Sequence, residues 1–338
     1  MYKLEDFLNK RYSLRNINDL EFENVCNDLA HQLINYNYKF NYEDRVLARD
    51  WGELCRFENF NNIINSSIRC GMKISEHFMP NFWSIKNSKG KSFENQWTID
   101  NLKKVLVWNR KSHSTPYMSE LRRGVYFCLG LTKNTMFRPQ LAKLICNKYK
   151  PDIVLDPCAG WGGRLLGTVA HGAKYIAFEP NTTTYDGLQA LVKFCNIQDR
   201  VQLICDDARN MHQYDFPQVD MVLTSPPYFD VEIYTKQTTQ SITNCNTYDE
   251  WATGFLKNII DQSLSRLNKH GVSCWNVGKV GSRFMQDDVA HYHQQNMFTN
   301  VNEFSVISSK RQALQTTDSK KSADVTVVYQ TCGYGANG

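Results

Sequence analysis

The stretch Ile153–Gly167, which reads IVLDPCAGWGGRLLG, decides the fold of this chain. Three apolar residues, Ile153–Leu155, predict a short buried strand that ends at Asp156. A glycine-rich turn containing Gly160 and Gly162 then leads into an apolar segment of helical character. This order predicts the first strand–loop–helix unit of an open α/β sheet, in which ligands bind beyond the carboxyl ends of the strands. The glycines let the backbone approach a ligand closely, because they carry no Cβ.

A second motif, Thr224-Ser225-Pro226-Pro227-Tyr228, follows another apolar strand, Val219–Leu223. A Pro-Pro pair after a strand can be an ordinary turn, because proline is excluded from central strands and the residue before it is held extended. The glycine-rich loop upstream favours a functional interpretation of the pair of motifs over two unrelated turns.

Together the two motifs resemble those of S-adenosylmethionine (SAM)-dependent methyltransferases that modify exocyclic amino groups of bases in DNA. The first is similar to their DPxAGxG motif, and Ser225–Tyr228 is similar to their (D/N/S)PPY tetrapeptide. The resemblance implies a Rossmann-like class I methyltransferase sheet with helices on both faces, and SAM as the cofactor. The cofactor-binding residues that it implies in the first loop are Asp156, Pro157, Ala159, Gly160, Trp161 and Gly162. A GxGxxG fingerprint is absent, which disfavours a nicotinamide-dependent dehydrogenase.

Three further positions are expected to complete the cofactor site. Glu179 directly follows the second strand, Tyr175–Phe178. Its separation from Asp156 is close to the spacing of about 20 residues at which a carboxylate reaches ribose hydroxyls. The resemblance implies that either Asp206 or Asp207, after the third strand, contacts the adenine amine. It also implies that Phe137, in a segment similar to motif X, walls the site.

The catalytic residues implied by the resemblance are Ser225, Pro226, Pro227 and Tyr228. The Ser225 side chain and the Pro226 carbonyl would accept the amine protons, the prolines would hold that carbonyl in place, and Tyr228 would stack on a base flipped out of double-stranded DNA. Tyr234 is expected to line the same cleft. Cytosine N4 is preferred as the target, because adenine-N6 enzymes mostly carry Asp or Asn before the prolines. The alternatives are adenine N6, a base of RNA, and a non-catalytic SAM- or nucleic-acid-binding module.

Other apolar segments predict the rest of the sheet: Val201–Cys205, Val272–Val277, Phe304–Ile307 and Val325–Tyr329. A helical pattern covers Tyr248–Leu267, and Asn268–Gly271 is expected to end that helix.

The chain is expected to divide into a mainly helical accessory region, residues 1–125, and a catalytic domain, residues 126–338. Few residues after Tyr228 remain unassigned, so by elimination the accessory region is the candidate for DNA recognition. Within it, Lys103–Arg123 mixes basic and aromatic residues, which suits phosphate attraction and base stacking. A solvated helix face explains the pattern equally well. The same two interpretations apply to the basic loop Ser308–Asp324.

The composition predicts a globular protein of the cytoplasm, and the resemblance implies a bacterial or virus-infected cell. Of the 338 residues, 42% are hydrophobic and 22% charged, and the net charge of +5 is compatible with a polyanionic partner. The start of the chain lacks a secretory signal, and the longest apolar stretch is too short to span a membrane. The 11 cysteines show no CxxC pair, which favours a reducing compartment. His291 and His293 have no third ligand nearby, so no metal site is expected.

Overall fold

The computed structural model describes residues 3–9, 12–59, 63–65, 67–87, 89–112, 115–131, 135–229, 241–243, 245–307 and 325–331. These residues form two compact units. One comprises residues 1–40 and 81–135, and the other comprises residues 41–80 and the sheet-forming residues from 136 onward. The division expected at residue 125 falls inside a helix, α7, and residues 41–80 pack with the sheet rather than with the rest of the N-terminal region.

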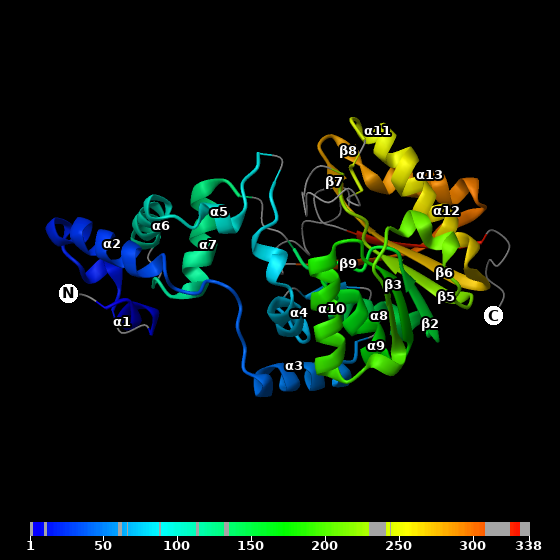
Figure 1. Ribbon diagram of the computed structural model, residues 1–338, viewed down its shortest axis with the longest axis horizontal. Helices are drawn as coiled ribbons and strands as arrows, with labels where there is room; N and C mark the ends of the chain where they lie inside the picture. Colours follow the sequence, from blue (N-terminus) through cyan, green and yellow to red (C-terminus); the bar gives the residue numbers. More distant parts are fainter. Residues whose placement is uncertain are drawn as a thin grey trace. The chain divides into compact units, whose positions relative to one another are not determined.

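Within the described residues, the second unit is built on an eight-stranded sheet with the order β1-β9-β10-β6-β5-β2-β3-β4 (Figure 1). Its strands are β1 (Ile63–Asn65), β2 (Ile153–Asp156), β3 (Lys174–Phe178), β4 (Val201–Ile204), β5 (Val219–Thr224), β6 (Leu267–Val277), β9 (Phe298–Ile307) and β10 (Val325–Thr331). Strands β6, β5, β2, β3 and β4 are parallel, whereas β10 is antiparallel to both β6 and β9. The expected Rossmann-like sheet of the class I methyltransferase type is therefore confirmed.

The chain leaves β2 on one side toward β3 and β4, and later returns to its other side at β5. Such a switch point in strand order opens a crevice at the carboxyl ends of the strands, and ligands bind there in open α/β sheets. The glycine-rich motif follows β2 and the Ser-Pro-Pro-Tyr motif follows β5, so both lie at this switch point.

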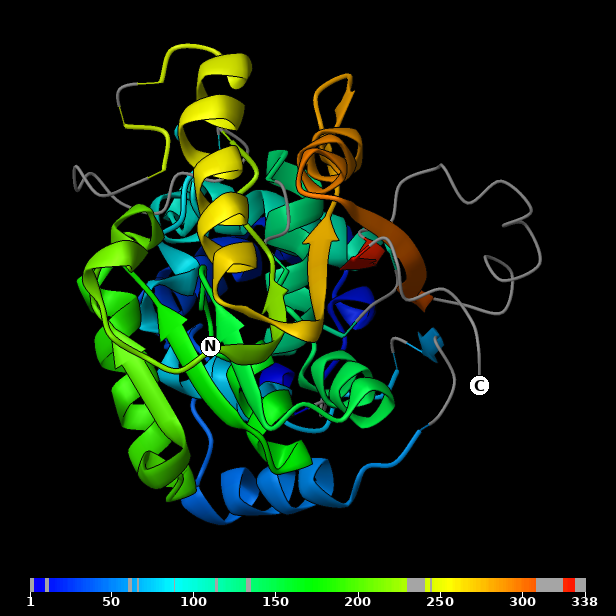
Figure 2. The ribbon, with the colours of Figure 1, turned by 90° about the vertical axis from the view of Figure 1, so that its right-hand side faces the viewer.

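Helices cover both faces of the sheet, as expected (Figures 1 and 2). On one face lie α8 (Pro139–Tyr149), α9 (Gly163–His171) and α10 (Thr182–Cys195), and on the other lie α12 (Lys257–Ser265) and α13 (Met285–Gln295). Residues 41–80 add α3 (Asp44–Arg56) and α4 (Met72–Phe78), and β1 pairs with β9 in parallel. The core on the α12 face includes four buried residues of the segment predicted to be helical: Trp251, Phe255, Ile259 and Leu264.

The region expected to be one helix over Tyr248–Leu267 contains a π-helical turn, Ala252–Leu256, between α11 (Tyr248–Trp251) and α12. The expected stop at Asn268–Gly271 is wrong, because β6 begins at Leu267 and runs through these residues. The pairing of β6 with β5 shifts register there, and a Cβ on Gly271 would lie 3.0 Å from the Asp220 carbonyl oxygen. The glycine thus serves a close approach of two strands rather than a helix end.

The N-terminal unit is mainly helical, as expected. Its helices are α1 (Leu4–Leu8), α2 (Asp19–Leu33), α5 (Phe93–Gln96), α6 (Ile99–Lys111) and α7 (Met118–Leu129). Its core includes an aromatic cluster in which Tyr38, Trp83, Phe93 and Trp97 have neighbouring ring centroids 4.7–5.6 Å apart. None of the helices among the described residues of the chain has the length and apolar character needed to cross a bilayer.

Candidate active site

The loop after β2 passes close to neighbouring backbone and side chains. Gly160 and Gly162 have φ angles of 55° and 77°, in the left-handed region that glycine adopts most easily. A Cβ on Gly162 would lie 3.0 Å from Leu191, and one on Gly163 would lie 2.0 Å from the Phe137 carbonyl oxygen. The sequence therefore places glycine where α9 starts against the segment that precedes α8.

Asp156, the last residue of β2, fixes this loop through hydrogen bonds. Its side chain is fully buried and accepts hydrogen bonds from the Cys158 N–H at 3.0 Å, the Tyr175 hydroxyl at 2.5 Å and the Arg164 Nε at 2.6 Å. The Thr224 hydroxyl donates to the same carboxylate at 2.7 Å. Because donors from the protein engage both oxygens, Asp156 organises the loop, and it also joins the first motif to the residue that opens the second.

Arg164 completes this buried network, and the sequence did not single it out. Its guanidinium pairs with Asp156 and donates to the carbonyl oxygens of Cys158 and Ala159. It also lies 5.2 Å from the ring centroid of Phe137. The predicted residues Pro157, Ala159 and Trp161 are buried, and Phe137 is half-buried.

Glu179 connects the glycine-rich loop after β2 to the loop after β3. It is 8% exposed, and its two oxygens accept the backbone N–H groups of Gly160 and Asn181, each at 3.0 Å. Burial raises the pKa of this carboxyl to about 7, against the lowering effect of these two hydrogen bonds. A carboxylate has about four lone-pair positions, so two remain for donors such as the hydroxyls of a diol.

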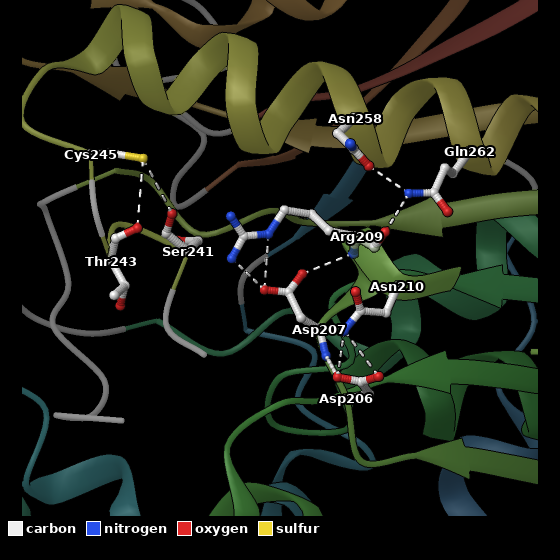
Figure 3. A network of polar contacts seen from close by, with 9 residues as sticks. All are labelled: Asp206, Asp207, Arg209, Asn210, Ser241, Thr243, Cys245, Asn258 and Gln262. Atoms are coloured by element: carbon white, nitrogen blue, oxygen red, sulfur yellow. Dashed lines mark hydrogen bonds and ion pairs between the residues drawn. The ribbon is translucent and has the colours of Figure 1, made fainter. Parts of the chain in front are cut away.

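The two acids after β4 face different surroundings (Figure 3). Asp206 accepts from Asn210 and from the Tyr214 hydroxyl, and these bonds outweigh burial and lower its pKa. Asp207 is buried and accepts from the backbone N–H and the guanidinium of Arg209. That arginine is further fixed through its carbonyl oxygen, which accepts from Gln262 at 2.7 Å.

The pKa values of two thiols near the site are raised by neighbouring acids. Burial and the negative charges of Asp156, Glu179 and Asp207 raise the pKa of the Cys158 thiol. The charge of Asp206 instead raises the pKa of the Cys205 thiol.

Asn276, near the end of β6, holds the Ser-Pro-Pro-Tyr turn. Its side-chain amide donates to the Ser225 Oγ at 3.3 Å and to the Tyr228 hydroxyl at 3.2 Å. The side-chain oxygen of Asn276, Oδ1, accepts a hydrogen bond from the Thr326 hydroxyl on β10 at 3.2 Å. One amide thus brings two predicted catalytic side chains together, and a third strand orients that amide.

The residue after the turn is anchored in an aromatic cluster. Phe229 has a φ of 46°, an uncommon conformation for a bulky residue. Its ring lies 5.9 Å from that of Tyr248 and 6.1 Å from that of Trp251, centroid to centroid. Left-handed backbone at such a residue persists only where packing determines it, and here the aromatic contacts fix the end of the turn.

No protein-family profile matches the chain, and no curated protein matches it. Solved structures resemble it in part. TrmN from Thermus thermophilus is 15% identical, with 57% of this chain and 49% of that chain covered and a TM-score of 0.41. A SAM-dependent O-methyltransferase from Thermotoga maritima is 13% identical, with 60% and 69% covered and a TM-score of 0.41. A 1,6-didemethyltoxoflavin N1-methyltransferase from Burkholderia thailandensis, with bound S-adenosylhomocysteine, is 13% identical, with 57% and 78% covered and a TM-score of 0.40.

This chain thus spans about half the length of TrmN. At these identities and TM-scores the likenesses do not assign an activity, so the function must be argued from the residues of the site.

Asn276 on β6 contacts the Ser-Pro-Pro-Tyr turn, and the sequence did not single it out. The available signal was a carboxamide in the apolar strand Val272–Val277, close to the carboxyl end where the site lies. Tyr234 and the basic loop Ser308–Asp324 lie outside the described residues. Among the described residues, no three His, Cys, Asp or Glu side chains are grouped to hold a metal ion. His293 is fully buried and bonded to Ser273 and to the Val289 carbonyl.

Proposed function

We propose that this protein transfers a methyl group from SAM to an exocyclic amino group of a base in DNA, with cytosine N4 as the preferred target. The observation that carries the proposal is the direct link between the two motifs. The Thr224 hydroxyl donates to Asp156, and next in sequence is Ser225, which shares the Asn276 amide with Tyr228. The glycine-rich loop and the Ser-Pro-Pro-Tyr turn therefore form one site.

The residues of the crevice fit SAM. Glu179 has two lone-pair positions left for the ribose hydroxyls. A Cβ on Gly160 would meet no protein atom closer than 3.8 Å, so its absence keeps that space free for a ligand. The contact with the adenine amine falls to Asp206 or Asp207, which follow β4. Asp156 acts indirectly, by holding the loop. Bound SAM would supply the methyl group as an electrophilic sulfonium.

The turn prepares the amine for attack. The lone pair of an exocyclic amine is delocalised into the ring, so the nitrogen is a poor nucleophile until acceptors hold its protons in a tetrahedral arrangement. The Pro226 carbonyl and the second lone pair of Ser225 supply those acceptors, since Asn276 occupies the first lone pair. With SAM bound, the nitrogen would form a bond to the methyl carbon, its extra proton would pass to solvent water, and the electron pair of the broken S–C bond would stay on sulfur. Tyr228 stacks on the flipped base.

The test is to incubate the protein with DNA and isotopically labelled SAM and to identify the modified nucleoside by mass spectrometry. We expect N4-methylcytosine, and a large loss of product with the Ser225→Ala variant at unchanged SAM affinity. N6-methyladenine as the only product would overturn the choice of base. Label in RNA alone would overturn DNA as the substrate, and no product with either nucleic acid would favour a non-catalytic binding module.

A further inference from the structure

The N-terminal unit carries an exposed aromatic stack, which we call the aromatic platform and define as Trp108, Arg123 and Phe127. The rings of Trp108 and Phe127 are nearly parallel, at 9°, with centroids 6.0 Å apart. The Arg123 guanidinium lies 5.4 Å from the first centroid and 5.6 Å from the second. Phe127 is 71% exposed, an unusual exposure for a ring of this size.

The packing of α6 on α7 builds the platform. A Cβ on Gly124 would lie 2.6 Å from Val105 and 3.1 Å from the indole of Trp108. The glycine therefore lets Trp108 lie over α7, where its ring supports that of Phe127. The packing of the two helices thus sets the position of Trp108 in the platform.

Cations surround these rings. Lys104 and Lys111 are exposed and lie four residues before and three residues after Trp108, which places them on the same face of α6. Arg123 is half exposed and pairs with Glu120 at 3.1 Å. An apolar partner docking on Phe127 would have to desolvate these charges, whereas a polyanion would be attracted by them.

Two other arginines of the same stretch are bound within the unit. Arg110 donates at 2.7 Å to the Ile17 carbonyl and to Asp19, and Arg122 donates at 2.7 Å to the Tyr38 carbonyl. The basic stretch noted in the sequence thus separates into residues that fasten the fold and residues that face outward with the rings.

We propose that the aromatic platform binds single-stranded DNA, with an unpaired base stacked on the outer face of Phe127 and phosphates near Lys104 and Lys111. The preference for unpaired nucleotides follows because neighbouring pairs cover the faces of bases inside a duplex. The inference rests on the proposed function, since a DNA-modifying enzyme whose target base leaves the duplex needs a surface for nucleic acid.

The test uses the full-length protein without SAM and measures binding of a fluorescein-labelled oligothymidylate by fluorescence anisotropy. Phe127→Ala should weaken binding about tenfold, the scale of losing one stacked base. Phe127→Tyr keeps a ring and should bind like the parent, whereas Phe127→Leu keeps apolar bulk and should bind like the alanine variant. Leu20→Ala is the matched control, because Leu20 is a 93% exposed apolar residue elsewhere in the unit.

A second variant tests the charges. The double substitution Lys104→Ala and Lys111→Ala should lower the slope of log affinity against log salt by about 1.4, from about 0.7 per phosphate contact on a single strand. Arg15→Ala removes another exposed charge of the unit. This control should change the slope of log affinity against log salt by no more than half as much as the double substitution does.

Binding by Phe127→Ala equal to that of the parent would overturn the proposal. Equal binding by the Leu and Tyr variants would also overturn it, because that result indicates apolar docking rather than stacking. Oligothymidylate contains neither cytosine nor adenine, so its binding does not depend on methyl transfer. Failure of the proposed activity and failure of the platform are thus observed separately.

Discussion

At the scale of single residues, the proposed ribose contact of Glu179 predicts that SAM binding depends on pH. Its carboxyl has a pKa of about 7 because it is buried, and the ribose hydroxyls require the ionised form as acceptor. The affinity for SAM should therefore be constant well above pH 7 and should fall by up to about tenfold for each pH unit below it. Calorimetric titration across this range measures the effect.

The Glu179→Gln variant is the control for this pH dependence. It should bind SAM more weakly than the parent by about 1–3 kcal/mol, the scale of losing hydrogen bonds to a charged group, and its affinity should not vary across the same pH range. A parent whose affinity stays constant from about pH 8 to about pH 6 would contradict the assignment of Glu179 to the ribose.

Under the proposed function, Asn276 is a positioning residue for the methyl transfer. In Asn276→Ala the Ser225 and Tyr228 side chains lose a shared donor, so the turnover number should fall about 10- to 100-fold, from two hydrogen bonds of about 1 kcal/mol each. SAM affinity should not change, because the amide contacts the turn and not the glycine-rich loop. Steady-state kinetics and SAM titration separate the two quantities.

Thr326→Val provides a graded control for Asn276→Ala. It preserves the volume of the side chain and removes only the hydroxyl that orients the amide, so its loss of turnover should be smaller. Equal losses in turnover and in SAM affinity for Asn276→Ala would indicate general damage to the site rather than positioning.

At the scale of elements, the close approach of α9 to α8 depends on Gly167. A Cβ there would lie 2.2 Å from the Pro139 carbonyl oxygen and 2.7 Å from the Lys143 nitrogen, both backbone atoms. Gly167→Ala should therefore lower the free energy of unfolding by about 1–3 kcal/mol, despite the higher helix propensity of alanine. Chemical denaturation measures this change.

Gly254→Ala serves as the comparison for Gly167→Ala. Gly254 is exposed, and a Cβ there would meet nothing within 4 Å. This substitution should leave the stability unchanged or raise it by up to about 1 kcal/mol. If both variants lost the same stability, the effect would not come from the α8–α9 contact.

Local patterns explain why the sequence predicted most of the elements correctly. Apolar runs such as Ile153–Leu155 and Val219–Leu223 mark buried parallel strands, and each functional loop follows its strand directly in sequence. Partners far apart in sequence leave no such local mark. The pairing of β1 with β9 and the bond from Thr326 to Asn276 both depend on the assembled sheet.

At the scale of the whole molecule, the lack of a local pattern for distant contacts explains why the sequence did not predict that residues 41–80 pack with the sheet. Residues 41–80 contain no motif, and their packing on the sheet side depends on contacts such as those of Lys143, which donates to the Leu54 and Cys55 carbonyls. The role of Asp156 was also hidden, because a strand-end acid in the glycine motif suggests a ligand contact. Its four donors come from three segments that only the fold brings together.

The position of β10 has a consequence for the order in which the protein matures on the ribosome. Strand β9 is synthesised before β10, yet β10 lies between β6 and β9 in the finished sheet. A nascent chain that has emerged only through β9 therefore lacks the strand that joins the parallel half of the sheet to its far edge. It also lacks the hydroxyl that orients Asn276, so the Ser-Pro-Pro-Tyr turn obtains this support only when residues 325–331 have left the exit tunnel. The final arrangement of the candidate site is in this way tied to the emergence of β10.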